Sequence, residues 1–258
     1  MTREDKFNKW FGIFIMVGMT IAVCTVTAIQ FHNKPEGRVL LLLSAFASLM
    51  GVVGTVTSAT GKICNFFFNF FDVAIYGIVC IINWYNGASG LGSGLLHLLY
   101  FVPMQFVGYA QWTKRSVSKG QVQPRRLTHS QRWLSVGVFA LMSVVIYIVL
   151  AQFDKSAAAG FIKVAVVLDV LPMVCNIIGQ FLMSTAYMEQ WVFWIGVNIF
   201  SIVMWTTSYI HTSDSFTLIY IIKYCFFLLN CCNGYRVWLR LSDPRIGQPH
   251  QNKVMNKY

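Results

Sequence analysis

The stretch that decides the fold reads EQWVFWIGVN, from Glu189 to Asn198. It belongs to an apolar segment long enough to cross a bilayer, yet it places a carboxamide near the middle of that segment. On a helix Trp191, Trp194 and Asn198 stand at i, i+3 and i+7, so two indoles and one amide share a face. Because an amide facing lipid would leave its hydrogen-bonding groups unsatisfied, this face is predicted to look inward.

The inward face of this segment has two interpretations. Two flat aromatic surfaces beside a hydrogen-bonding amide suit a planar heteroaromatic ligand. The same side chains also suit interhelical packing, with the indoles filling the bundle and the amide bonded to a neighbouring helix. The stretch alone does not choose between them.

Composition defines the class of protein. The chain has 258 residues, of which 56% are hydrophobic and only 11% charged, with a mean hydropathy of +0.58. Soluble domains carry about 25% charged residues, so this is predicted to be a polytopic membrane protein. The net charge of +11 resides mainly in short loops and tails, where basic residues meet the lipid bilayer. We therefore exclude nucleic acid as a partner.

The cysteines and the N-terminus add little chemistry. All seven cysteines lie in or beside apolar segments without metal-finger spacing, which indicates buried, reduced thiols and no metal site. Arg3, Lys6 and Lys9 precede the first apolar run as in a signal peptide. That run is as long as a spanning helix and lacks a clear cleavage site, so an uncleaved anchor is expected.

Hydropathy predicts an all-α membrane protein with eight transmembrane helices. The expected spans are 10–31, 39–60, 63–85, 91–112, 133–153, 163–186, 190–208 and 216–239. The single long hydrophilic connection, 113–132, is rich in lysine and arginine, and the positive-inside rule assigns it to the cytoplasm. Both termini are then cytoplasmic as well.

The basic connection divides an internal repeat. A shift of 126 positions places Gly108 on Gly234 and Trp112 on Trp238, and it also pairs Phe68 with Trp194, Asp72 with Asn198 and Ser58 with Ser184. The predicted architecture is one extra N-terminal helix followed by a 3+1+3 parallel-repeat core. The predicted boundaries are 1–38 for the tail and extra helix, 39–112 for the first three-helix repeat, 113–153 for the basic loop and linker helix, 154–240 for the second repeat, and 241–258 for a cytoplasmic tail.

Ionisable and polar groups at membrane depth are the candidate functional residues, because exposing them to lipid is costly. Asp72 and Asp169 are the acids well inside a span, and Lys223 is a base about seven residues from the outer end of the last span. Asp169 and Lys223 are expected either to form a structural ion pair or to belong to the site. Other inward polar positions follow helical spacing: Asn69, Gln105, Asn176, Gln180 and Asn230.

Several residues have structural interpretations. Gly108 and Gly234 are expected to permit close helix approach, and Trp112 and Trp238 to anchor the chain at the membrane interface. Pro103 is expected to kink its helix or to act as a pivot. The sequence lacks a zinc-protease motif, a phosphate-binding glycine loop, a nucleophile elbow and a dinucleotide fingerprint, so it is not predicted to be an enzyme, and no cofactor is expected.

These residues resemble a known family. Asp169, Gln180 with Leu182-Met183, and Glu189 followed by the Trp194–Asn198 spacing are similar to the PnuC family of bacterial nicotinamide riboside (vitamin B3) transporters. The run from Gln105 to Trp112 is similar to that family's glutamine–glycine–tryptophan segment. The resemblance implies a core similar to SWEET-type sugar transporters. One departure is Ser184-Thr185-Ala186-Tyr187, where the family leads us to expect basic residues near an inner gate.

The resemblance also implies a function. It is uptake of nicotinamide riboside across the bacterial inner membrane by facilitated diffusion, with two three-helix bundles rocking around the substrate. A cytoplasmic nicotinamide riboside kinase would then trap the vitamin by phosphorylation. The expected substrate-binding residues are Trp194, Asn198, Gln105, Asp169, Gln180, Asn230, Trp191, Phe68 and Asp72.

Alternatives remain open from the sequence. Members of the same family carry thiamine or riboflavin. A retinal protein has seven helices with a lysine in the last one, and Lys223 can be read in that way, although it lies near the end of its helix. An integral-membrane enzyme and a SWEET-type sugar transporter are further alternatives. The sequence leaves the oligomeric state open, a homo-oligomer included.

Overall fold

The computed structural model describes residues 3–33, 37–86, 91–118, 120–153, 164–212 and 215–243. These ranges form long helices and one small β-hairpin. The elements are α1 (Arg3–Asn33), α2 (Arg38–Ala59), α3 (Asn65–Tyr85), α4 (Leu91–Leu96), the π-helical η1 (His97–Phe101), α5 (Val102–Lys114), β1 (Ser116–Ser118), β2 (Gln121–Val122), α6 (His129–Phe153), α7 (Val164–Ser184), α8 (Gln190–Thr212) and α9 (Ser215–Leu241). Most of the predicted tail, 241–258, and the loop lysines Lys34, Lys155 and Lys163 lie outside the described residues.

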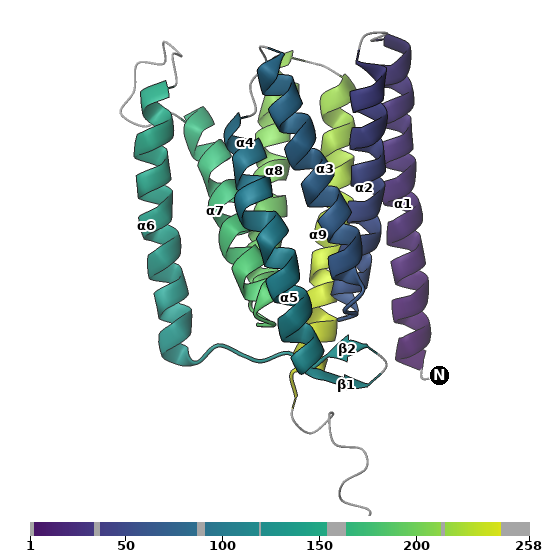
Figure 1. The fold of residues 1–258 in the computed structure, drawn as a ribbon, viewed down its shortest axis with the longest axis vertical. Coiled ribbons are helices and arrows are strands. Elements are labelled where there is room, and N and C mark those ends of the chain that lie inside the picture. Colours follow the sequence, from purple (N-terminus) through teal and green to yellow (C-terminus); the bar gives the residue numbers. More distant parts are fainter. Residues whose placement is uncertain are drawn as a thin grey trace, which may run out of the picture.

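The prediction of an all-helical membrane protein is confirmed. Seven helices of the described chain are long and apolar enough to cross a membrane, and each overlaps one of the predicted spans. The eighth predicted span, 216–239, lies within α9, which is 27 residues long and runs alongside the other helices (Figure 1). The hairpin was not predicted; it occupies the start of the basic connection.

The span from Leu91 to Lys114 is distorted around Pro103. Its helix widens into the π-helical turn η1 immediately before the first turn of α5, which contains the proline. Proline has no N–H to donate to the carbonyl four residues earlier, and its ring collides with that carbonyl. A π-turn is one of the local distortions that produce a bend.

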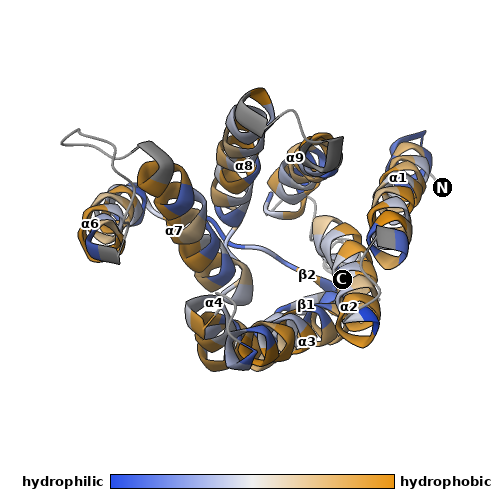
Figure 2. Cartoon of the chain, turned by 90° about the horizontal axis from the view of Figure 1, so that it is seen from above, coloured by the Kyte–Doolittle hydropathy of each residue, from blue (hydrophilic) through white to orange (hydrophobic). Residues whose placement is uncertain are grey.

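The helices form two groups of three with two outlying helices. We call α2, α3 and α4–η1–α5 the first trio, and α7, α8 and α9 the second trio. Viewed along the long axis, the six spans of the trios form a ring (Figure 2). Helix α1 lies outside the ring against α2 and α9, and α6 lies outside it against α7.

The turn between the first two helices of each trio has the same hydrogen bonds. Gly61 N–H donates to Ser58 O (2.9 Å) and Ala186 N–H to Met183 O (2.9 Å), a spacing of 125 residues. The bonds of Lys62 and Tyr187 follow the same spacing. Gly61 and Ala186 also share a left-handed backbone, with φ of 70° and 61°, a region that costs an alanine free energy.

The predicted shift of 126 is therefore wrong by one residue over these helices. It pairs Ser58 with Ser184, whereas the turns pair Ser58 with Met183. Helices α3 and α8 begin at Asn65 and Gln190, so Phe66 corresponds to Trp191 and Phe68 does not correspond to Trp194. The shift was set by the tryptophans of the third helices, where 126 does hold.

Those two tryptophans bond across the trios in a reciprocal way. The Trp112 indole donates to Met183 O (2.7 Å), and the Trp238 indole donates to Ser58 O (3.0 Å). Both side chains are 0% exposed and belong to one hydrophobic cluster with Phe66 and Trp191. The prediction that they anchor the chain at the membrane interface is wrong, because each indole N–H reaches a carbonyl of the opposite trio and not the headgroups.

Close approach at the two glycines is confirmed. A Cβ at Gly108 would lie 2.2 Å from Phe66 Cε1, and one at Gly234 would lie 2.6 Å from Trp191 Cη2. Only a hydrogen atom fits at either place, so both positions require glycine. These contacts hold α5 against α3 and α9 against α8 around the tryptophan cluster.

The basic connection passes both turns. Ile63 N–H donates to Gly120 O (2.9 Å) beside the first turn, and Met188 N–H donates to Arg125 O (2.9 Å) beside the second. The Arg125 guanidinium donates to Thr185 O (3.0 Å) and lies 4.3 Å from the centroid of the Tyr187 ring. A basic group thus covers the 184–187 segment, although it comes from the connection and not from the segment itself.

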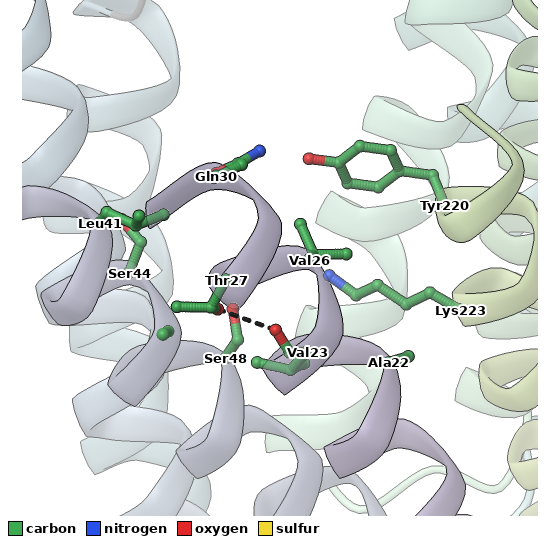
Figure 3. A pocket seen from close by; sticks show the side chains of 11 residues that line it. Ala22, Val23, Val26, Thr27, Gln30, Leu41, Ser44, Ser48, Tyr220 and Lys223 are labelled. Atoms are coloured by element: carbon green, nitrogen blue, oxygen red, sulfur yellow. Dashed lines mark hydrogen bonds between the residues drawn. The ribbon is translucent and has the colours of Figure 1, made fainter. Parts of the chain in front are cut away.

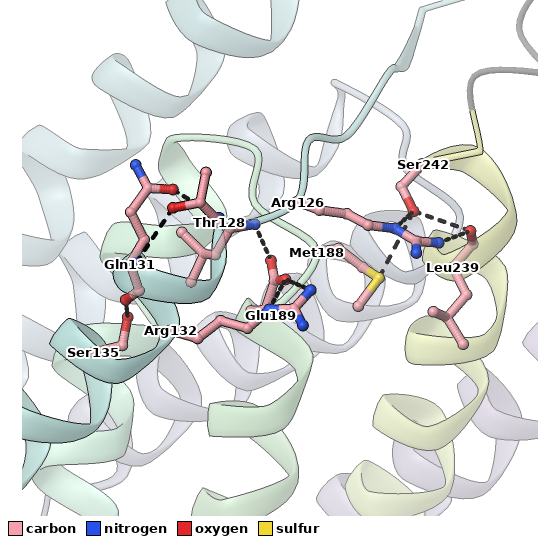
Figure 4. Close-up of polar contacts among 10 residues, drawn as sticks. Arg126, Thr128, Gln131, Arg132, Ser135, Met188, Glu189, Leu239 and Ser242 are labelled. Carbon is pink, nitrogen blue, oxygen red and sulfur yellow. Dashed lines mark hydrogen bonds and ion pairs between the residues drawn. The ribbon is translucent and has the colours of Figure 1, made fainter.

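Glu189 fixes the end of this connection to α8 (Figure 4). Its carboxylate accepts from Leu127 N–H (3.0 Å) and pairs with Arg132 (3.1 Å) at the start of α6. Farther along the same face, Arg126 donates to Ser242 Oγ and to Leu239 O at the end of α9. The connection therefore contacts the last helix, the α7–α8 turn and α6.

The two partners in this ion pair are expected to contribute unequally. Glu189→Ala should lower the free energy of unfolding by about 1–3 kcal/mol, because it leaves the buried Leu127 N–H without an acceptor. Arg132→Ala should cost less than about 1 kcal/mol, because the arginine side chain is 53% exposed. Thermal unfolding in detergent, followed by circular dichroism, measures both. Equal losses for the two variants would contradict the importance of the Leu127 contact.

Candidate functional site

Four of the residues predicted to bind substrate are buried polar groups on four different helices. Gln105 of α5, Gln180 of α7, Asn198 of α8 and Asn230 of α9 are each at most 5% exposed. Because they come from both trios, the ring of helices encloses amides from each side. The arrangement is neutral: these four side chains carry donors and acceptors but no charge.

One pair of amides lies where α5 meets α7. Gln180 donates to Ser184 Oγ (3.0 Å), and Ser184 donates in turn to Met104 O (2.9 Å). Beside Met104, Gln105 donates to Phe101 O (3.1 Å), while its side-chain oxygen has no partner among the described residues. A buried acceptor without a donor costs free energy, so Gln105 Oε1 is free to accept a hydrogen bond from a ligand.

The other pair lies along α9, which packs against α8 on one side and α2 on the other. Asn198 donates to Trp194 O (2.7 Å) of its own helix and to Cys231 Sγ (3.4 Å) of α9. Asn230, adjacent to Cys231, donates to Thr55 O (3.3 Å) of α2. The prediction that Asn198 faces inward is confirmed by its burial and its α9 partner. Its side-chain oxygen is an acceptor beyond these two contacts.

The aromatic candidates occupy different places. Trp194 is partly buried and packs on α7, where a Cβ at Gly179 would lie 3.3 Å from its Cε2 atom. Trp191 is 2% exposed and fills the tryptophan cluster, its ring centroid 5.9 Å from that of Trp238. Phe68 of α3 is half-buried and makes an edge contact with Phe67. Trp194 is thus the indole of this stretch with surface left for a ligand.

Asp169 lies apart from the amides. It stands eleven residues before Gln180 on α7, which places it on the same helix face about 16 Å away. Its side chain is exposed. The carboxylate is therefore about three helical turns from Gln180 along α7 and does not lie beside the amides.

The predicted ion pair between Asp169 and Lys223 is not found among the described residues. The carboxylate with which Lys223 interacts electrostatically is Asp72, on α3. Asp72 packs against α2, where a Cβ at Gly51 would lie 2.5 Å from its Oδ2 atom. Asp72 thus feels the charge of Lys223 without forming a close ion pair among the described residues, and it does not belong to the amide groups described above.

Three contributors were missed from the sequence. Ser184, Cys231 and the carbonyl of Met104 complete the contacts of the amides. Ser184 had an available signal, because it follows Gln180 by four residues on one helix face. Within the described residues no three His, Cys, Asp or Glu side chains gather as metal ligands.

Neutral amides, a partly open indole and helices of spanning length define a membrane transporter with a polar interior. Comparison with known families agrees: the profile of the nicotinamide mononucleotide transporter family matches residues 41–240. The chain belongs to this family, which is a family of membrane transporters and not of enzymes.

Individual relatives agree with the family. The chain is 31% identical over 228 residues to the nicotinamide riboside transporter PnuC of Neisseria mucosa, covering 86% of this chain and 80% of the relative. It is 27% identical to PnuC of Haemophilus influenzae, covering 77% and 80%. A crystal structure of the vitamin B3 transporter PnuC superposes with a TM-score of 0.63 at 27% identity, covering 94% of this chain and 93% of that one.

Proposed function

We propose that this protein takes up nicotinamide riboside across the bacterial inner membrane by facilitated diffusion. The observation that carries the proposal is the set of buried, uncharged amides from both trios, one of which, Asn198, contacts Trp194. The relatives are named as nicotinamide riboside transporters, which supports the same substrate.

The neutrality of the amides favours the riboside over its phosphorylated form. The family description names the mononucleotide, whereas the relatives are named for the riboside. A phosphate brings about two negative charges, and burying them requires a cation or a dense set of N–H donors. The lysine at membrane depth, Lys223, interacts with Asp72 on the side of α2. The riboside carries no phosphate and needs no such cation.

Each site residue has a proposed role. Trp194 stacks on the pyridinium ring, because a cation over an indole face gains cation–π attraction. Gln105 and Asn198 bond the carboxamide of the substrate through their remaining acceptors, and Gln180 and Asn230 bond the ribose hydroxyls. Asp169 attracts the cationic substrate toward the amides. Trp191, Phe68 and Asp72 support the site from outside it.

The proposed mechanism is alternating access between two like-oriented trios. The repeated turn hydrogen bonds and the reciprocal tryptophans support a 3+1+3 parallel repeat of the SWEET type. Rocking of one trio against the other exposes the amides to one side at a time. No coupled ion is required, and a cytoplasmic kinase retains the product as its charged phosphate.

The proposed orientation places the basic connection and both termini in the cytoplasm. In Figure 1 the start of α1, the hairpin and the last turns of α9 lie at one end of the bundle, which we call the hairpin end. The lysines and arginines of these segments are thereby collected at that end, as the positive-inside rule requires of a cytoplasmic face.

Isothermal titration of the purified protein tests the substrate. We expect nicotinamide riboside to bind, and nicotinamide mononucleotide, thiamine and riboflavin to bind at least tenfold more weakly, about 1.4 kcal/mol each. Tighter binding of thiamine or riboflavin would contradict nicotinamide riboside as the substrate, but the protein would still be a vitamin transporter. A visible absorbance band after addition of retinal would instead favour a retinal protein.

A further inference from the structure

A cavity lies away from the amides, between the extra helix α1 and the two trios (Figure 3). It has a volume of about 120 Å³. Helix α1 supplies one wall, α2 of the first trio a second, and α9 of the second trio a third. The lining residues are Ala22, Val23, Val26, Thr27, Gln30, Leu41, Ser44, Ala45, Ser48, Tyr220 and Lys223.

The polar groups of this pocket favour an anion. Lys223 and Tyr220 extend from α9 toward α1, and the Gln30 amide extends from α1 toward the Tyr220 hydroxyl (Figure 3). An ammonium, a phenol and an amide are all donors that match phosphate oxygens. No aspartate or glutamate is among the lining residues.

A second basic residue, Arg38, lies on the helix that forms one wall of the pocket. Arg38, the first residue of α2, precedes Leu41 by three residues and so shares the face of α2 that lines the pocket. Its guanidinium lies 4.4 Å from the centroid of the Phe31 ring on α1. Arg38 and Lys223 thus place two basic side chains at this end of the α1–α2–α9 junction, and the Asp72 carboxylate offsets part of the lysine charge.

The remaining lining mixes small aliphatic and hydroxyl side chains, and the pocket lies at the membrane end opposite the hairpin end. Gln30 and Leu41 stand near the α1–α2 connection, at the far ends of their helices from the hairpin. Ala22, Val23, Val26 and Ala45 continue the lining with small aliphatic side chains. A ligand with a charged head and an apolar body matches this order of groups.

The Asp72 carboxylate does not occupy the pocket. Its carboxylate offsets part of the charge of Lys223, but it packs against Gly51 and does not line the pocket. Thr27 and Ser44 donate to carbonyls of their own helices, so their hydroxyl oxygens stay available as acceptors for water. The lysine therefore borders a carboxylate that balances it and a cavity that can hold a second anion beside Arg38.

We propose that this pocket binds the headgroup phosphate of an anionic phospholipid, with Lys223, Tyr220 and Gln30 around the phosphate and Arg38 at the start of α2. The acyl chains lie along α1 and α2 in the membrane. Because the pocket is bounded by α2 of one trio and α9 of the other, the bound lipid contacts both trios where they meet beside α1.

Native mass spectrometry of the full-length protein with added lipids tests this proposal. The probes are phosphatidylglycerol and phosphatidylcholine, which share the phosphate and differ in net charge. We expect phosphatidylglycerol to bind about fivefold or more tightly than phosphatidylcholine. Lys223→Gln should abolish the preference, whereas Lys114→Gln, the same charge change at an exposed lysine of the hairpin end, should leave it unchanged.

A second variant keeps the test decisive where Lys223→Gln fails to fold. Ser48→Leu fills the pocket without altering any charge, so it should also remove the preference. A preference that survives Ser48→Leu, or equal binding of the two lipids to the unaltered protein, would overturn the proposal. If inorganic phosphate stabilises the protein as much as phosphatidylglycerol does, the site binds a free anion and the lipid proposal is wrong.

Discussion

Trp194→Ala is expected to weaken nicotinamide riboside binding roughly 30-fold, because the pyridinium loses about 2 kcal/mol of cation–π attraction in a desolvated site. The indole is positioned by contacts that do not involve substrate. It packs on Gly179 of α7, and the backbone carbonyl of Trp194 accepts from Asn198. Titration calorimetry gives the change in Kd, and uptake into proteoliposomes gives the change in transport.

Matched variants separate stacking from folding. Trp194→Phe keeps an aromatic face and should lose less than half of that free energy. Trp84→Ala removes an indole that is 47% exposed at the end of α3, and it should leave binding unchanged. If Trp194→Ala and Asn198→Ala both bind and transport the riboside as the unaltered protein does, the proposed site is wrong.

Trp112→Ala and Trp238→Ala are each expected to lower the free energy of unfolding by about 3–5 kcal/mol. Both indoles are fully buried, with ring centroids 5.1 Å apart, so either truncation opens a large cavity in one cluster. Each also removes the donor from a buried carbonyl of the opposite trio. Unfolding monitored by circular dichroism in detergent measures the loss without relying on tryptophan fluorescence.

The phenylalanine variants isolate the hydrogen bond. Trp112→Phe and Trp238→Phe retain most of the packing, so they should lower the free energy of unfolding by less than the alanine variants do. About 1 kcal/mol of their loss should come from the missing N–H hydrogen bond, in addition to the loss from the smaller buried side chain. Trp133→Ala on α6 serves as the control, since that indole is 65% exposed. A loss at Trp112 no larger than at Trp133 would contradict the central place of the cluster.

Helix positions were predictable because a bilayer imposes a length and a polarity on each span. The predicted 163–186 and 190–208 lie within two to four residues of α7, Val164–Ser184, and α8, Gln190–Thr212. The inward orientation of Gln105 and Asn198 followed from the same solvent argument, because a lipid-facing amide has no partner. Both side chains are buried.

Partners across helices were not predictable from spacing. Helical periodicity tells which residues share a face, but not which neighbouring helix that face meets. A pair between Lys223 and Asp169 was one of two expectations, based on their similar depth, whereas the carboxylate that interacts electrostatically with Lys223 is Asp72, on α3. The wrong prediction for Trp112 and Trp238 has the same cause. Their positions near helix ends indicated the membrane interface, but their hydrogen-bond acceptors come from the opposite trio.

The one-residue error in the repeat has a similar origin. Recognisable identities occur in the third helices, Gly108 with Gly234 and Trp112 with Trp238, and they fix a shift of 126. The turns carry few identical side chains, and their equivalence at 125 is visible only in backbone hydrogen bonds and in the left-handed Gly61 and Ala186. Backbone conformation of this kind leaves little trace in a single sequence when an alanine stands where a glycine does.

Each half of the chain depends on the other for the hydrogen-bond acceptor of its buried tryptophan. Trp112 takes its acceptor from Met183, and Trp238 takes its acceptor from Ser58, so a half severed within the basic connection would bury a donor with nothing to receive it. Such a fragment lacks that acceptor until the complementary half binds it. The two hydrogen bonds therefore couple the folding of one half of the chain to the presence of the other half.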